Sequence, residues 1–507
     1  MNSLSKFSLN AGGLILTSSM LMPFCLLSQN KPQKPKRPNV LFIWTDQQRA
    51  SSMEVYGNKE FKVPNINKLA SESVVFMNSY CTQPVSTPSR GCVMTGMYPH
   101  KHGAVENDIA LFQESQCLPE LLKDTTYATA YFGKWHLGDE IFAQHGFQEF
   151  DSSEDGYAKY FSREKDRNQR SGYHHFLLSK GYKPDAVETN TFSRLFASNL
   201  PYEFTKPNWL ALKAKDFLVR HKDQPFVMYV NYLEPHTPFN GPFNKLHSID
   251  SLNLSSNLNK PLTDNDPVYL RALSRNKSDN YYLEMYQRYA GLCHSVDLSI
   301  GEILNKLDEL GLTNNTIIVF TSDHGEMMGS HTLDNKSVMY EEALRIPLLI
   351  KVPWFQSSQL KIDYPTTNIN ILPTLLDLLG KDSKQFSQLQ GESLAPLVKG
   401  GFVKSKNIYM IWNPTQRAKS KSFKVAGITA VEMNKYSNAK FRTVITPDGW
   451  KLTLSDVDKC QLFDLKKDPG EVDNLYYTGK YNSLIKKLKV DIANWQKRTG
   501  DNCILPL

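Results

Sequence analysis

Residues 86–96 read Ser86-Thr87-Pro88-Ser89-Arg90-Gly91-Cys92-Val93-Met94-Thr95-Gly96 in this chain of 507 residues. Six of these positions form the pattern of interest: Ser86, Pro88, Ser89, Arg90, Thr95 and Gly96. Each residue type accounts for roughly 5–7% of an average protein, so the joint pattern is expected by chance about once in ten million start positions. Taken alone, the segment is a Pro/Ser-rich turn that enters a helix, and the rest of the chain decides whether it is more.

Apolar segments of strand length end abruptly in polar residues at three places. The segments and the residues that follow them are Val40–Trp44 before Asp46 and Gln47, Phe226–Val230 before His236, and Thr316–Phe320 before Asp323 and His324. Continuous β-branched and aromatic runs are typical of parallel strands buried on both faces. Ligands of open α/β sheets bind beyond the carboxyl ends of such strands, so the three segments indicate one shared site.

Further motifs follow in order along the chain, and together they carry a family resemblance. They are Gly133-Lys134-Trp135-His136, Glu234-Pro235-His236, Ser322-Asp323-His324-Gly325-Glu326 and Lys336, and later Leu462-Phe463-Asp464-Leu465, Asp468-Pro469 and Asn474-Leu475. With the Ser86 segment they resemble the type I, formylglycine-dependent sulfatases of the alkaline phosphatase superfamily, in the branch with Ser at the head of the motif. The resemblance covers most of the chain.

The resemblance implies an α/β fold with a large mixed, mostly parallel sheet flanked by helices, as in alkaline phosphatase, and a smaller C-terminal α+β subdomain. We place a signal peptide at 1–28, a linker at 29–38 and the catalytic domain at 39–400. The C-terminal subdomain, at 401–507, is expected to hold a small antiparallel sheet and a terminal helix.

Helical spacing of apolar residues predicts helices over 292–310, 370–379 and 484–495. The region from Tyr157 to Asn280 is rich in Asn, Ser, Tyr and Lys and has weak periodicity. We therefore expect much of it to form loops and small insertions over the active face.

Ser86 is the residue that the resemblance identifies as the nucleophile. An unmodified serine without an adjacent base is a poor nucleophile. The resemblance implies oxidation of Ser86 to formylglycine, whose hydrate attacks sulfur, and Arg90 would hold that hydrate by charge-assisted hydrogen bonds. Because the position is Ser rather than Cys, the family pattern also implies a transient maturase partner of the oxygen-independent radical type.

A divalent cation, usually calcium, is the cofactor that the resemblance implies. Its ligands would be Asp46, Gln47, Asp323 and His324, together with the modified Ser86. Two positions depart from the commonest family pattern, since Gln47 stands where a second Asp is usual and His324 where Asn is usual. This set has one negative charge fewer and one nitrogen more, which favours calcium less strongly than an all-oxygen set.

Four more residues receive roles from the resemblance. Lys134 and Lys336 would bind the sulfate oxygens, where cations stabilise the charge that develops in the transition state. His136 would assist breakdown of the sulfated intermediate, and His236 would donate a proton to the leaving sugar oxygen. His331 is expected to lie just outside the ligand shell.

The N-terminus predicts an exported protein, either periplasmic or secreted. Lys6 precedes a mostly apolar segment, Ala11–Leu27, which is too short and too interrupted for a membrane span, and cleavage near Ser28 fits it. An uncleaved anchor and a lipoprotein processed at Cys25 are alternatives. Neither the spacing of the seven cysteines nor any Cys/His pattern predicts a particular disulfide or a zinc site.

A net charge of +8 favours anionic partners, and a sulfated carbohydrate fits it. The basic residues are scattered and no nucleic-acid-binding module is present, so we expect no nucleic-acid partner and no stable membrane insertion. The leading interpretation is an exported carbohydrate sulfatase. Algal polysaccharides such as ulvan are favoured over glycosaminoglycans as its substrate. A phosphate or phosphonate ester hydrolase of the same superfamily and an inactive sulfated-glycan-binding protein are the alternatives.

Overall fold

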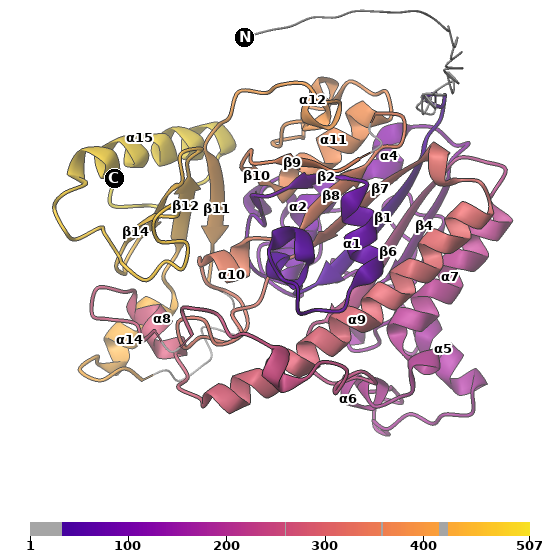
Figure 1. The fold of residues 1–507 in the computed structure, drawn as a ribbon, viewed down its shortest axis with the longest axis horizontal. Coiled ribbons are helices and arrows are strands. Elements are labelled where there is room, and N and C mark those ends of the chain that lie inside the picture. Colours follow the sequence, from indigo (N-terminus) through magenta and orange to yellow (C-terminus); the bar gives the residue numbers. More distant parts are fainter. Residues whose placement is uncertain (1–32, 259, 356–357, 415–423) are drawn as a thin grey trace, which may run out of the picture.

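The computed structural model describes residues 33–258, 260–355, 358–414 and 424–507, whose strands form a large sheet, a smaller C-terminal sheet and one two-stranded pairing (Figure 1). The predicted signal peptide lies outside the described residues. The helices are α1 (Pro64–Ser71), α2 (Ser86–Thr95), α3 (Pro99–His102), α4 (Leu118–Leu122), α5 (Gly172–Ser179), α6 (Arg194–Ser198), α7 (Lys206–Arg220), α8 (Val268–Leu273), α9 (Asp279–Glu309), α10 (Glu341–Leu344), α11 (Ile371–Leu378), α12 (Ala395–Val398), α14 (Ala430–Ser437) and α15 (Asn482–Thr499).

The large sheet has eight strands in the order β5-β4-β6-β1-β7-β8-β2-β9. They are β1 (Asn39–Asp46), β2 (Val74–Phe76), β4 (Ala128–Gly133), β5 (Glu149–Asp151), β6 (Phe226–Pro235), β7 (Thr316–Ser322), β8 (Leu348–Lys351) and β9 (Leu360–Ile362). β8 runs antiparallel to both of its neighbours, and the other pairings are parallel. The predicted mixed, mostly parallel sheet is therefore confirmed.

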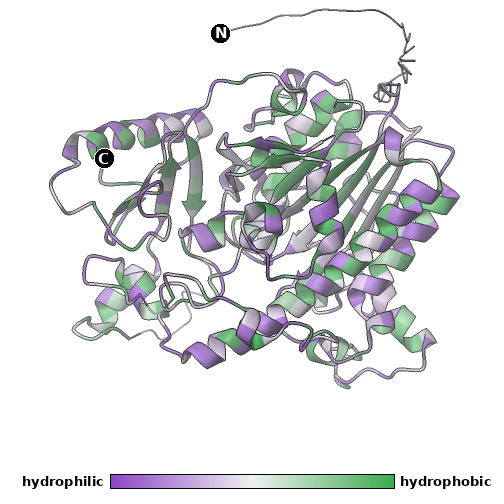
Figure 2. Cartoon of the chain, in the orientation of Figure 1, coloured by the Kyte–Doolittle hydropathy of each residue, from purple (hydrophilic) through white to green (hydrophobic). Residues whose placement is uncertain are grey.

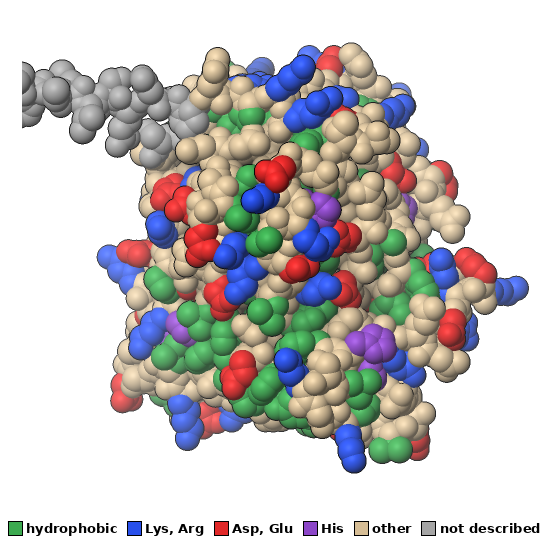
Figure 3. Space-filling model, turned by 90° about the vertical axis from the view of Figure 1, so that its right-hand side faces the viewer, with side chains coloured by type: hydrophobic (Ala, Val, Ile, Leu, Met, Phe, Trp, Pro, Cys, Tyr) green, Lys and Arg blue, Asp and Glu red, His purple; other side chains and the backbone are tan. Residues whose placement is uncertain are grey.

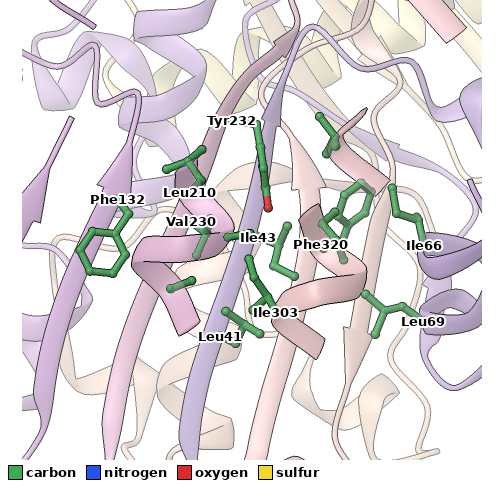
Figure 4. Close-up of a cluster of buried hydrophobic side chains, with 14 of the residues drawn as sticks. Leu41, Ile43, Ile66, Leu69, Phe132, Leu210, Val230, Tyr232, Ile303 and Phe320 are labelled. Carbon is green, nitrogen blue, oxygen red and sulfur yellow. The ribbon is translucent and has the colours of Figure 1, made fainter. Parts of the chain in front are cut away.

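Helices cover both faces of this sheet, which explains why its central strands are apolar throughout. Leu41 and Ile43 of β1 point to one face, where they pack with residues of α1, α7 and α9 (Figure 4). Val40, Phe42 and Trp44 point to the other face, toward α2, α4 and α11. Figure 2 shows the strands in green between helices that are purple on their outer sides.

The C-terminal part forms the second sheet, which is antiparallel as predicted. Its strands are β11 (Ile408–Trp412), β12 (Phe441–Ile445), β13 (Trp450–Ser455) and β14 (Gln461–Asp464), hydrogen-bonded in that order. Helix α15 packs on this sheet through Ile485, Leu488, Ile492 and Trp495. The two-residue strands β3 (Ser79–Tyr80) and β10 (Thr366–Thr367) form a separate parallel pairing.

The three predicted helices correspond to α9, α11 and α15, and α9 begins earlier than expected, at Asp279. The loop interpretation of 157–280 is wrong in part. Helix α7 occupies Lys206–Arg220 and is a core element, because Leu210, Ala214 and Phe217 pack against the sheet and α9. The residues before it do form short helices and turns.

No helix in the described part of the chain is both long and apolar enough to cross a membrane. The six cysteines of the described residues are all unpaired. On the face drawn in Figure 3, basic and acidic side chains are interspersed rather than gathered into a field of one sign.

Candidate active site

Four neighbouring strands deliver polar residues to one edge of the large sheet. Asp46 is the last residue of β1, and Asp323 and His324 directly follow β7. Lys134 directly follows β4, and His236 follows β6. Because β4, β6, β1 and β7 lie side by side and parallel, their carboxyl ends bring these side chains together. The strand pattern predicted this for three of the strands, and β4 with Lys134 is the fourth.

Asp46, Asp323 and His324 form a buried cluster suited to a divalent cation. Their ligand atoms all lie within 4.8 Å of one another. His324 Nε2 is 3.8 Å from Asp46 Oδ1 and 3.6 Å from Asp323 Oδ1. Asp46 Oδ1 is buried without a hydrogen-bond partner among the described residues, a situation that a bound cation would relieve. Two carboxylates and an imidazole are ordinary ligands of such ions.

Arg90 contacts both carboxylates of this cluster and offsets their negative charge. Its Nε donates to Asp323 Oδ2 at 3.1 Å, Nη2 to Asp46 Oδ2 at 3.2 Å, and Nη1 to the carbonyl of Lys134 at 2.9 Å. The guanidinium also lies 4.6 Å from the centre of the Trp44 ring. Burial opposes ionisation of Asp46, yet Lys134, whose Nζ is 2.6 Å away, together with Arg90 holds its pKa well below the usual range.

Ser86 is the first residue of α2, and its Oγ lies 3.1 Å from His324 Nε2. Every residue of α2 is buried, so the helix holds Ser86 on a rigid element beside the cluster. Ser89 donates to the backbone carbonyl of Asp323, and Asn368 donates to Ser89 Oγ at 2.9 Å. No motif in the sequence indicated the part that Asn368 plays in fixing α2.

The Gln47 side chain lies between Glu326 and Lys336. Its Nε2 donates to Glu326, its Oε1 accepts from Lys336 Nζ, and its backbone N–H donates to Asp323 Oδ1 at 3.0 Å. Gln47 adopts a left-handed backbone conformation, with φ of 67°. Burial lowers the pKa of Lys336 to about 8, with Asp46 opposing the shift. The structure therefore places Gln47 and Lys336 beside the cluster of Asp46, Asp323 and His324, and the two side chains contact each other.

His136 is oriented by two acids. Its Nε2 lies 3.0 Å from Asp108 Oδ1, while its backbone N–H donates to Glu140 Oε2 at 2.6 Å. Its Nδ1 is buried and has no hydrogen-bond partner among the described residues. Burial, together with the Lys134 charge, lowers the pKa of His136 to about 3, so the ring is neutral at pH 7.

His236 lies with Nδ1 2.8 Å from the carbonyl of Thr237, which leaves Nε2 as the nitrogen available to a ligand. Burial and the Lys336 charge lower its pKa well below the usual range. His331 lies apart from these residues. Its ring stacks on the ring of Tyr340 with the centroids 4.1 Å apart, and its Nε2 lies 3.2 Å from Asn257 Nδ2.

A cavity of about 530 Å³ lies above these residues. Ser86, Lys134, His136 and His236 line it, and the Asp46 cluster is buried behind them. The other wall comes from the segment between β5 and α7 and from the first residue of α7, Lys206. It includes polar and aromatic side chains: Glu154, Asp155, Tyr157, Tyr173, His174, Phe192, Arg194 and Lys206. The part of this wall from Tyr157 onward was expected over the active face, but Glu154 and Asp155 lie before it, and none of the wall residues was singled out from the sequence.

Two family models match the chain. The model of the sulfatase family matches residues 38–381, and the model described as N-sulphoglucosamine sulphohydrolase, C-terminal, matches residues 329–498. Among known proteins, the chain is 28% identical over 501 residues to the ulvan-active sulfatase of Formosa agariphila, an alignment that covers 95% of this chain and 87% of that protein.

The N-acetylglucosamine-6-O-sulfatase of Bacteroides thetaiotaomicron is 27% identical over 538 residues, with 96% of this chain and 92% of that protein covered. The crystal structure of the phosphonate monoester hydrolase of Agrobacterium radiobacter superposes with a TM-score of 0.72 at 21% identity, covering 91% of this chain and 96% of that one. This last likeness concerns the fold alone, and it agrees with the alkaline phosphatase-like architecture that the sequence predicted.

Proposed function

The chain belongs to the sulfatase family and is a sulfuric ester hydrolase, and we propose that it removes sulfate from a carbohydrate through a formylglycine made from Ser86. One observation carries the proposal most strongly. Ser86 Oγ lies 3.1 Å from His324 Nε2, at the floor of the cavity and beside the buried Asp46 and Asp323 carboxylates. The residue proposed as nucleophile, the cluster proposed to bind a cation and a ligand-sized cavity therefore lie together.

Formylglycine, in its hydrated form, would supply the oxygen nucleophile that unmodified Ser86 lacks. Calcium or a similar ion, held by Asp46, Asp323, His324 and the Gln47 amide oxygen, would offset the negative charge of the sulfate and orient the nucleophile. Arg90 balances the two carboxylates of that site, and this balance keeps Asp46 ionised and ready to bind a cation.

The chain's own residues divide the remaining work. Lys134 and Lys336 would receive the sulfate oxygens and stabilise charge as the sulfur–oxygen bond to the sugar breaks. His236 would give a proton to the departing sugar oxygen. Burial and, after it, the Lys336 charge keep this histidine unprotonated, and the negative sulfate would offset the Lys336 charge. His136, neutral with a free Nδ1, would accept a proton as the sulfate is finally released.

The substrate we propose is a sulfated polysaccharide or one of its oligosaccharides. Sugar hydroxyls bind well to walls of mixed carboxylate, imidazole and tyrosine side chains, and the cavity has such a wall. The similarity to the ulvan-active sulfatase supports an algal substrate over a glycosaminoglycan. Export to the periplasm or medium fits a polymer that is degraded outside the cytoplasm.

Mass spectrometry of the active enzyme tests the proposal at Ser86. The peptide that contains residue 86 should lack two hydrogens relative to serine, and Ser86→Ala should abolish turnover of sulfated oligosaccharides and of 4-nitrophenyl sulfate. Full activity with unmodified serine would refute the mechanism. A preference for phosphonate monoesters over every sulfate ester would assign the other chemistry of this superfamily.

A further inference from the structure

Arg194 lies on the wall of the cavity, in the part of the chain between β5 and α7, and not on the floor formed by the strand ends. From its contacts we infer that Arg194 binds a second anionic group of the sugar, a carboxylate or a further sulfate, close to the sulfate that is hydrolysed. The inference rests on the proposed function and narrows its substrate class to sulfated sugars that carry another negative charge.

The hydrogen bonds of Arg194 leave one edge of its guanidinium unused. Nε donates to Glu154 Oε2 at 2.7 Å, and Nη2 donates to the Tyr157 hydroxyl at 2.9 Å. Nη1 has no hydrogen-bond partner among the described residues, and 32% of the side chain is exposed. A guanidinium nitrogen held in a fixed orientation with two free N–H groups is well suited to an oxygen of a carboxylate or sulfate.

The group around Arg194 carries surplus positive charge. Glu154 is shared, because its other oxygen accepts a hydrogen bond from Lys206, so two cations face one carboxylate. Glu234, the next carboxyl group beside Lys206, is half-buried, and desolvation raises its pKa to about 7, so it is only partly ionised at neutral pH. A positive charge in a recess sheltered from water attracts an anion more strongly than the same charge on an open surface.

Arg194 also lies near the position where the sugar would leave. Arg194 and His236 both line the main cavity and the small recess beside it, so the guanidinium and the imidazole face the same space. The floor has its own cations for the reacting sulfate, Lys134 and Lys336. An anion on Arg194 would therefore belong to the sugar and not to the group being hydrolysed.

Paired substrates test this inference. Each pair consists of an oligosaccharide that the matured enzyme desulfates and the same compound with its second anion removed, by carboxyl reduction for a uronate or by selective desulfation for a second sulfate. The unaltered enzyme should favour the charged member by about 10- to 100-fold in kcat/KM, mainly through KM, which is the range expected for one charged hydrogen bond. The type of pair that shows this preference distinguishes a carboxylate from a sulfate.

Arg194→Ala should abolish the preference, and its loss on the charged sugar should exceed its loss on 4-nitrophenyl sulfate by at least about tenfold. Arg194→Lys retains the positive charge, so comparing it with Arg194→Ala distinguishes loss of that charge from a folding defect. Arg170→Ala is the matched control, because Arg170 lies in the same region but, among the described residues, donates its hydrogen bonds to backbone carbonyls outside the cavity.

Several results would overturn the inference. Equal losses for Arg194→Ala on both members of a pair would make Arg194 a structural residue of the wall. Equal losses on sugar and aryl sulfates would place it on the reacting sulfate. An unaltered enzyme that favours the uncharged member would also refute it. Absence of turnover on every sulfate ester would reject the proposed function first, and this inference with it.

Discussion

Replacing Glu154 with Gln should destabilise the fold by about 2–3 kcal/mol at pH 7. Glu154 is 3% exposed and accepts hydrogen bonds from both Arg194 and Lys206. Burial opposes its ionisation, but the two cations overcome this and lower its pKa from 4.5 to about 2. At about 1.4 kcal/mol per pH unit, this fall stabilises the folded state by about 3.5 kcal/mol once the group is ionised.

The variant should lose slightly less than this amount because a neighbouring acid can compensate. Glu154 raises the pKa of Glu234, in addition to the larger effect of burial. Without the Glu154 charge, Glu234 would ionise more readily and pair with Lys206, so the double variant Glu154→Gln/Glu234→Gln should be less stable than the two single variants predict.

The pH dependence gives the sharper test. A carboxyl group whose pKa is depressed on folding contributes stability above its unfolded pKa and loses it as pH falls toward its folded pKa. The difference between the unaltered protein and Glu154→Gln should therefore shrink as pH falls from about 4.5 toward about 2. Glu234 is the matched control with the opposite sign. Its raised pKa of about 7 costs stability as pH rises from 4.5, so Glu234→Gln should be neutral or stabilising at pH 7.

Urea unfolding followed by far-ultraviolet circular dichroism, at several pH values, measures these differences. An unfolding free energy for Glu154→Gln within about 0.5 kcal/mol of the unaltered protein at pH 7, the range of ordinary surface changes, would refute the reasoning. A larger difference that is independent of pH down to about 3 would mean that packing, rather than charge, accounts for the role of Glu154.

Three further predictions concern the floor of the site. Chelation and dialysis should abolish hydrolysis of all sulfate esters, calcium should restore it, and Asp323→Asn should need more calcium for recovery; an unchanged rate in metal-free protein would contradict the cation site. His236→Ala should slow sugar sulfates by roughly 10²–10⁴-fold but spare most activity on aryl sulfates, whose leaving groups scarcely need a proton; equal losses would instead assign His236 to the sulfate. Asp108→Asn should slow both substrate types by about tenfold or more and displace the pH profile of kcat, since it releases His136 Nε2; an unaltered profile would show that Asp108 does not position that ring.

The sequence predicted the floor of the site better than its wall, for a physical reason. Parallel strands buried on both faces must be apolar along their length, so Asp46 and Asp323 mark the strand ends unambiguously. No comparable constraint marks the wall. The ion pairs of Glu154 join residues 40 and 52 positions further along the chain, and nothing in the local pattern distinguishes these charges from surface ones.

Helix α7 was missed for a related reason. Its buried face is present in the sequence as Trp209, Leu210, Ala214, Phe217 and Leu218. The composition of the surrounding region, however, is polar enough to suggest loops. Asn368 was missed because a single buried amide that ties Ser89 to the site has no pattern of its own.

The division between floor and wall has a consequence for reaction and specificity. In the proposed mechanism, the floor fixes where a sulfate group and its nucleophile meet, and every sulfate ester would use it, so changes there should lower rates on all substrates together. The wall would contact what is attached to the sulfate. Relatives that align with 95% and 96% of this chain are active on ulvan in one case and named for N-acetylglucosamine-6-sulfate in the other, so similarity over the whole chain does not determine the sugar. Substitutions at Arg194 and its partners should therefore reorder the preference among sugars, whereas substitutions at Asp46 or Arg90 should not.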